Sequence, residues 1–121
     1  MKLRNRFVRS ATYDGMAVVS GEVSEAQIGL ISDLAAGGVG LIVHAITYVH
    51  PSGQVSPFMN SLAADEFIPG MQKLTAAAHR HGAAIAVQLY HGGREARFVK
   101  TRNELPLAPS IVPDDPFYKG H

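Results

Sequence analysis

The sequence predicts an α/β protein whose core is a β-α-β-α-β unit with a parallel sheet. Three short β-prone runs, near residues 6–12, 39–46 and 83–90, alternate with two helical patterns near 24–36 and 66–81. Strands that alternate with helices of three to four turns are typical of right-handed crossovers between parallel strands. The carboxyl ends of such strands are where α/β folds place their sites, so the ends of these runs carry the functional prediction.

Each predicted strand ends in small or polar residues. The first run finishes in Ser10-Ala11-Thr12, and the second carries His44 next to Ala45. The third is continuously apolar until Gln88, with His91 in the turn that follows, and we expect this strand to be buried on both faces. Three sequential strands with ends of this character indicate one ligand site at one edge of the sheet.

Start and stop signals frame both predicted helices. Ser24 and Gln27 have the spacing of a capping box, and Gly37-Gly38 supplies a left-handed stop for the first helix. Pro69 fits a helix only in its first turn, and Gly82 ends the second helix just before the third strand. Both helices are therefore bounded by local chemistry as well as by periodicity.

Two segments are predicted to be irregular. Residues 48–64 are polar and rich in Pro and Gly, which indicates a long loop at the carboxyl end of the second strand. Residues 93–121 lack periodicity and contain four prolines, so we expect an irregular loop there. Loops of this length are usually functional or disordered.

Length and composition predict one globular unit whose sheet must be covered by further structural elements. The chain has 121 residues and is 46% hydrophobic, which is enough for a sizeable core. A parallel sheet requires helices on both faces, however, and two helices cannot cover three strands on two sides. We expect the remaining cover to come from further chain, from a second copy in a homo-oligomer, or from another subunit.

Several functional classes are disfavoured by composition. A net charge of +1 argues against general affinity for nucleic acid. The absence of cysteine excludes a disulfide scaffold and thiolate chemistry, and it agrees with a cytoplasmic location. No apolar run is long enough to span a bilayer, so we expect no membrane association. His79 and His81 face different sides of a helix, and we predict no metal site.

Gln88 is the strongest candidate for ligand contact. A buried primary amide needs both a donor and an acceptor, and a flat heterocycle with an imide edge would supply them, as would neighbouring backbone. His44 and His91 are equally compatible with ligand contact and with ordinary structural roles. Arg94 either anchors its loop or presents charge to a ligand, and Tyr13 could act as an acid only with help from its surroundings.

Three motifs in the right order resemble the first three strands of the Old Yellow Enzyme family, the FMN-dependent NAD(P)H:flavin oxidoreductases and ene-reductases. The motifs are residues 5–13, His44-Ala45 and residues 88–94, and Ile68-Pro69-Gly70 and Leu107-Ala108-Pro109-Ser110 agree as well. The resemblance covers nearly the whole chain. It implies the N-terminal β-α-β-α-β portion of a (β/α)8 TIM barrel, incomplete in this chain, because such barrels need roughly 250 residues.

The same resemblance implies FMN as cofactor, NADH or NADPH as reductant, and hydride transfer through the flavin to an activated alkene or a similar small-molecule acceptor. By position, the implied cofactor-binding residues are Ser10, Ala11, Thr12, Tyr13, Ala45 and Gln88. Gln88 would hydrogen-bond the pyrimidine edge of the ring. The candidates on the substrate side are His44, His91 and Arg94.

The family's substrate-anchoring pair, proton donor and phosphate-binding groups lie beyond the third strand, so we expect no catalytic residue within these 121 residues. Gly15 also stands where some members have a substrate-binding tyrosine. We therefore expect the chain alone to bind FMN weakly and to be inactive. The alternative is a non-catalytic barrel fragment that self-associates or needs a complementary chain. An aldolase or a sugar-phosphate isomerase fits less well, because these strand ends offer neither a lysine nor a carboxylate pair.

Overall fold

The central strand, β2 (Leu41–Tyr48), organises the parallel sheet of the computed structural model, which describes residues 2–110. β4 (Ala84–Tyr90) pairs with β2 along its whole length. The other edge of β2 is shared by two short strands: β1 (Val8–Arg9) pairs with its first residues and β3 (Asn60–Ser61) with its last. All pairs are parallel, so the carboxyl ends of the strands lie at one edge of the sheet.

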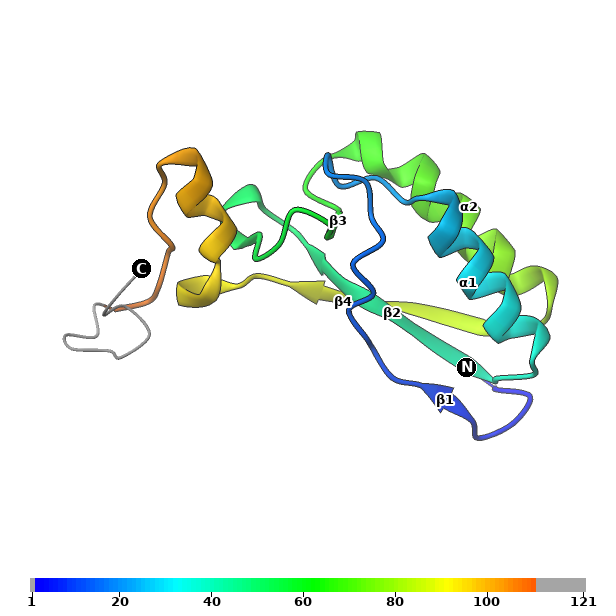
Figure 1. Cartoon of the computed structure of the whole chain (residues 1–121). Helices are drawn as coiled ribbons and strands as arrows, with labels where there is room; N and C mark the ends of the chain where they lie inside the picture. The colour runs from blue at the N-terminus through cyan, green and yellow to red at the C-terminus, as the bar shows by residue number, and fades with distance from the viewer. Residues whose placement is uncertain (1, 111–121) are drawn as a thin grey trace.

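Both helices cover the same face of this sheet, as Figure 1 shows. α1 (Glu25–Ala36) begins with the predicted capping box, and α2 (Ile68–Arg80) carries its proline in the first turn. The left-handed residue after α1 is Gly38, with φ of +97°. The core lies between the helices and the central strands, and its buried residues are Ile31, Ala35, Ile42, Leu74, Ala77, Ala78 and Ala83.

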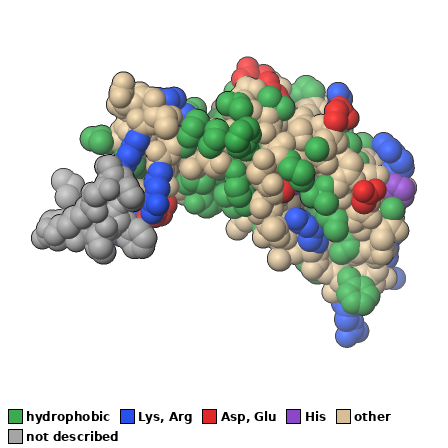
Figure 2. All heavy atoms as spheres, in the orientation of Figure 1, with side chains coloured by type: hydrophobic (Ala, Val, Ile, Leu, Met, Phe, Trp, Pro, Cys, Tyr) green, Lys and Arg blue, Asp and Glu red, His purple; other side chains and the backbone are tan. Residues whose placement is uncertain are grey.

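The expected burial of the third strand is wrong. Residues 86–89 of β4 are exposed, and Leu89 keeps 63% of its surface accessible. In the described part of the chain β4 pairs with β2 alone, so it is an edge strand, and residues 86–89 are exposed on both of its faces. Figure 2 shows apolar side chains exposed between the helices and the segment that follows β4. The expectation that two helices leave the sheet partly uncovered is confirmed.

The two segments expected to be irregular contain short elements. Residues 48–64 include the 3₁₀ turn η1 (Pro51–Gly53) and the two residues of β3, which extend the sheet beyond β1. After β4 the chain forms the 3₁₀ segments η3 (Gly93–Glu95) and η4 (Arg97–Arg102), while residues 111–121 of the predicted loop lie outside the described residues. A strand of two residues is too short to show a periodic pattern, which explains why the sequence did not reveal β3.

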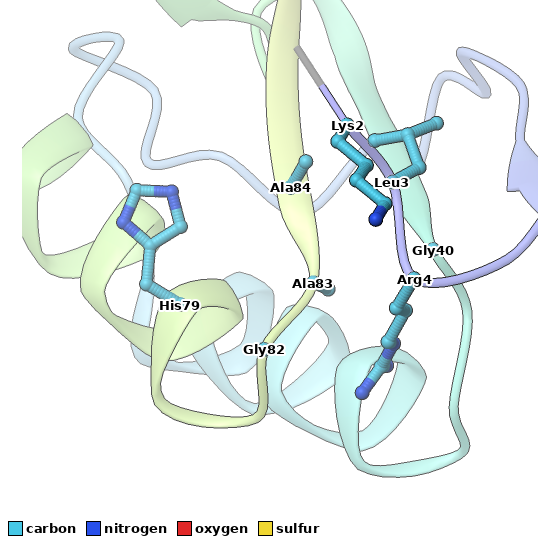
Figure 3. A pocket seen from close by; sticks show the side chains of 8 residues that line it. All are labelled: Lys2, Leu3, Arg4, Gly40, His79, Gly82, Ala83 and Ala84. Atoms are coloured by element: carbon cyan, nitrogen blue, oxygen red, sulfur yellow. The ribbon is translucent and has the colours of Figure 1, made fainter.

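A cavity of about 310 Å³ lies at the opposite, amino-terminal end of the strands (Figure 3). The Arg4 guanidinium at its wall donates to the carbonyl oxygens of Ala35, Val39 and His81. Arg4 thus satisfies carbonyl groups near the ends of both helices, which favours a structural role. The Arg4 side chain is used by hydrogen bonds to the backbone, so the candidate functional site is the carboxyl end of the sheet.

Candidate functional site

A β-bulge shapes the carboxyl end of β2. The pairing with β4 runs regularly up to His44 opposite Val87 and resumes with Ile46 opposite Gln88, so Ala45 is the extra residue. Bulges are common at the rims of barrels and next to active sites, where they redirect side chains. Ala45 itself is buried, and its carbonyl oxygen accepts a hydrogen bond from the Thr47 hydroxyl at 3.1 Å.

Gln88 lies on the sheet face away from the helices. Successive residues of a strand point to opposite faces. Ile85 packs against the helix-side core and Val87 lines a cavity beside α2, which places Gln88 on the other face. Its side chain is exposed, and its amide makes no hydrogen bond with any described residue. The amide is therefore accessible as both a donor and an acceptor.

The segment 10–13 leaves the sheet directly after the two residues of β1. Ser10, Thr12 and Tyr13 are exposed and Ala11 is half-buried. Within the described range, the backbone groups of residues 11–13 make no hydrogen bond to other backbone groups. The Tyr13 hydroxyl lies 2.5 Å from Ser56 Oγ, which joins this segment to the loop after β2. The segment thus presents small side chains, and backbone groups that are not paired with other backbone, at the carboxyl end of the sheet, where Gln88 also lies.

His44 lies in a different environment from the one expected of a substrate contact. Only 2% of its surface is accessible, and its Nε2 lies 3.1 Å from Asn60 Oδ1. It lines an apolar cavity of about 300 Å³ between α2 and β4, on the helix side of the sheet. Burial lowers the pKa of His44, against the opposing effects of the Asn60 hydrogen bond and the Asp14 charge, so the ring is neutral at pH 7.

Asn60 connects His44 to a buried polar network that the sequence did not reveal. Gln27 Nε2 lies 2.7 Å from Asn60 Oδ1, and Asn60 Nδ2 lies 3.1 Å from Gln27 Oε1. Gln27 Nε2 also lies 3.1 Å and 3.2 Å from the two carboxylate oxygens of Asp14. The capping-box pattern predicts only the role of Gln27 at the start of α1. The signal for its burial is its place four residues before Ile31 and eight before Ala35, which are the other buried residues of the helix.

His91 belongs to an exposed chain of hydrogen bonds between two loops. The Gly93 amide donates to His91 Nδ1 at 3.0 Å, so Nε2 carries the ring hydrogen and donates to Ser52 Oγ at 2.9 Å. The Ser52 hydroxyl in turn donates to His50 Nδ1 at 2.7 Å. The structure therefore brings His91 to the loop after β2, together with Ser52 and His50, which the sequence analysis did not single out.

Arg94 lies in η3, beside the turn that follows β4. Its side chain is exposed, and its Nε lies 3.7 Å from a carboxylate oxygen of Glu95. A second arginine, Arg102 of η4, donates to Gln54 Oε1 at 2.8 Å and to the Pro51 carbonyl at 2.9 Å. The segment after β4 is thus bound to the loop after β2 through Arg102, through His91 and through the Gly92 amide, which donates to the Gly53 carbonyl at 2.9 Å.

Residues 2–110 contain neither a metal-binding cluster nor a helix suited to a membrane. No group of three or more His, Cys, Asp or Glu side chains there is placed to hold a metal ion. No helix in that range is long and apolar enough to cross a membrane.

The chain matches the model of the NADH:flavin oxidoreductase / NADH oxidase family over residues 1–121. It is 36% identical to a 4,4'-dithiodibutanoate disulfide reductase of Rhodococcus erythropolis, over 91% of this chain and 27% of that protein. It is also 36% identical to an NADPH dehydrogenase of Halalkalibacterium halodurans, over 93% of this chain and 32% of that protein. The chain spans less than a third of the length of either relative.

Solved structures show the same fold. A 2-naphthoyl-CoA reductase is 30% identical, with a TM-score of 0.74 over 77% of this chain and 14% of its own. The Old Yellow Enzyme of Pichia sp. AKU4542 superposes over 93% of this chain and 30% of its own with a TM-score of 0.83, at 23% identity, which shows the shared fold. The predicted fold class is confirmed, and the chain belongs to the NADH:flavin oxidoreductase / NADH oxidase family, as the N-terminal portion of an Old Yellow Enzyme-type barrel.

Proposed function

We propose that this chain is the ring-facing part of the flavin site of an FMN-dependent NAD(P)H oxidoreductase. The observation that carries the proposal is the accessible amide of Gln88 at the same sheet edge as the exposed segment 10–13 and the bulged Ala45. Membership of the family supplies the cofactor and the reductant, which are FMN and NADH or NADPH.

The described residues fit an isoalloxazine ring. A primary amide donates and accepts at once, which matches the alternating C=O and N–H groups of the pyrimidine edge. The segment 10–13 offers backbone groups without ladder partners, and the half-buried Ala11 has a side chain small enough for a flat ring to approach. The cofactor-binding roles of Ser10, Ala11, Thr12, Tyr13, Ala45 and Gln88 are therefore part of this proposal.

A bound flavin would supply the redox chemistry, taking a hydride from NAD(P)H and passing it to an activated alkene or a similar acceptor. The residues of this chain orient the ring: Gln88 fixes its pyrimidine edge and segment 10–13 fixes its plane. On the substrate side we retain His91 and Arg94, which are exposed at this edge. His44 is buried against Asn60, and we assign it a positioning role instead of contact with the acceptor.

The groups that hold the flavin phosphate in this family are not expected among these residues, so we propose that the chain alone binds FMN weakly and does not turn over. An alternative role, a barrel module that self-associates or joins a complementary chain, is supported by the open edge of β4. Val87 and Leu89 are exposed there, beside the apolar cavity next to α2. Sedimentation velocity of the purified chain tests the alternative, because a clean monomer with no partner bound would count against it.

Titration of the purified chain with FMN, followed by visible absorbance and flavin fluorescence, tests the proposed site. We expect saturable binding at one flavin per chain, weakened about tenfold in Gln88→Ala through loss of the paired amide contacts. Leu89→Ala is the matched control, because Leu89 is the exposed neighbour on the opposite face and should leave the affinity unchanged. Equal affinities for the wild type and Gln88→Ala would contradict the proposed site.

A further inference from the structure

A buried polar network joins the segments that the proposed function places against the flavin. Asp14 directly follows segment 10–13 and His44 directly precedes Ala45. Gln27 and Asn60 link Asp14 to His44 by hydrogen bonds. Gln27 and Asn60 each keep only 1% of their surface accessible. No buried polar side-chain atom in residues 2–110 lacks a hydrogen-bond partner, so the network is fully satisfied.

The hydrogen bonds of this network have one allowed direction. A carboxylate only accepts, so Gln27 must turn its Nε2 toward Asp14, and the Ser24 amide donates to Gln27 Oε1 on the other side. The Gln27 amide then faces Asn60 with both groups fixed, which orients Asn60 in turn. Because Asn60 Oδ1 accepts, the hydrogen of the neutral His44 ring must lie on Nε2.

Asp14 connects the buried network to the segment that precedes it. Its Oδ1 accepts from the Met16 amide at 2.9 Å, which closes the turn through Gly15, where φ is +67°. Residues 11–13 themselves make no backbone ladder that would fix their position. β1 attaches segment 10–13 to the sheet on its amino side, and the Asp14 side chain attaches it to the buried part of the fold on its carboxyl side.

From these contacts we infer that Asp14, Gln27, Asn60 and His44 are positioning residues that set segment 10–13 and Ala45 relative to each other for the flavin ring. The inference rests on the proposed function, because it assigns these residues to the same site. None of the four needs to touch the flavin. They restrict the conformations of two flavin-facing segments that follow different strands. Less conformational entropy is then lost when the flavin binds.

The first test compares FMN affinity in two variants of Asp14. Asp14→Ala removes the acceptor for Met16 and Gln27, and we expect FMN binding about tenfold weaker. Asp14→Asn retains an acceptor oxygen and should remain within about twofold of the wild type. Ser32→Ala is the control: it removes a 3.3 Å hydrogen bond to His81 from the same helix as Gln27, but outside the network, and should leave the affinity unchanged.

The second test uses pH and does not depend on the fold of Asp14→Ala. Gln27→Glu places a carboxyl group against Asp14, where burial and the neighbouring charge raise the pKa of the new group. We expect FMN binding by this variant to be weakened at pH 8 and restored at pH 5.5, where the protonated group can donate to Asp14. The wild type should gain no affinity between pH 8 and pH 5.5. A gain confined to Gln27→Glu would not be produced by a loss of packing alone.

A measurement without flavin completes the test. Nitrogen-detected NMR of the wild-type chain should show a neutral His44 with its hydrogen on Nε2 between pH 7 and 8. The opposite tautomer would overturn the inferred network. If Gln88→Ala loses FMN while Asp14→Ala and Gln27→Glu at pH 8 bind like the wild type, the positioning role is overturned and the proposed function stands. If the wild type binds no FMN, both are overturned.

Discussion

Two histidine-centred clusters lie at the carboxyl end of the sheet, one beneath the helices and one in solvent. His44 donates to Asn60 within a buried network, whereas His91 donates to Ser52 in an exposed chain that ends at His50. Loss of a hydrogen-bond partner has different consequences in the two clusters. A buried group left unpaired costs its full desolvation penalty, while an exposed group is rehydrated. Burial, more than the number of hydrogen bonds, decides how much each cluster contributes to stability.

The largest effect is expected for Asn60→Leu. The substitution leaves the Nε2–H of His44 and one hydrogen of Gln27 without acceptors inside the fold. We expect a loss of about 3 kcal/mol in the free energy of unfolding, measured by urea denaturation. A loss below about 1 kcal/mol would mean that water reaches these groups, and the contrast between the two clusters would disappear.

A smaller effect is expected where backbone approaches the exposed cluster closely. A Cβ added at Gly53 would lie 2.7 Å from the His91 ring and 2.9 Å from its Cα, so Gly53→Ala must separate the two loops. We expect a loss of about 1 to 2 kcal/mol. Gly29→Ala is the matched control, because nothing lies within 4 Å of its added Cβ and alanine favours the helix. Equal stabilities of the two variants would refute the close packing.

The pH dependence of stability separates His44 from its neighbours. Burial lowers the pKa of His44 in the folded chain below the ordinary value of 6.5, so the unfolded chain takes up more protons as pH falls through 6.5. The stability gained by keeping this ring neutral is therefore present above pH 6.5 and lost below it. We expect the wild-type Tm to fall more between pH 7.5 and 5.5 than the Tm of His44→Gln, which keeps a donor but cannot titrate. Parallel Tm curves would contradict this assignment.

Ser52→Ala should have the smallest effect. Ser52 is partly accessible, and water can replace its hydroxyl as the partner of both His50 and His91. We expect a change of no more than about 0.5 kcal/mol in the free energy of unfolding. Hydrogen exchange at the Gly92 amide, which donates to the Gly53 carbonyl, should nevertheless accelerate as the loops loosen. A destabilisation as large as that of Asn60→Leu would remove the distinction between the clusters.

The element order and the helix caps could be predicted because their signals are local. Ser24 and Gln27 lie three residues apart and form the expected capping box. The burial of β4 could not be predicted in the same way, because an apolar run indicates a strand and does not reveal which neighbours cover it. Whether residues 86–89 are buried depends on which elements pack against β4, and in the described structure these residues are exposed.

The candidate site was only partly visible in the sequence. Gln88 could be selected because a polar residue ending an apolar strand stands out in a single run. The different environments of His44 and His91 could not be predicted, because the bulge at Ala45 and the two residues of β3 determine what His44 contacts. Asn60 was hidden within a loop-like segment, and its contact with Gln27 spans 33 residues.

The central claim is that this chain holds the ring-facing part of a flavin site without the phosphate-binding part. The most direct measurement compares the affinities of the 121-residue chain for FMN and for riboflavin, which share the ring and differ in the phosphate. We predict weak, saturable binding of both with affinities equal within about twofold, because only the ring is held and the phosphate lacks the donors that grip it. Tight stoichiometric binding of FMN, with riboflavin bound far more weakly, would contradict the claim.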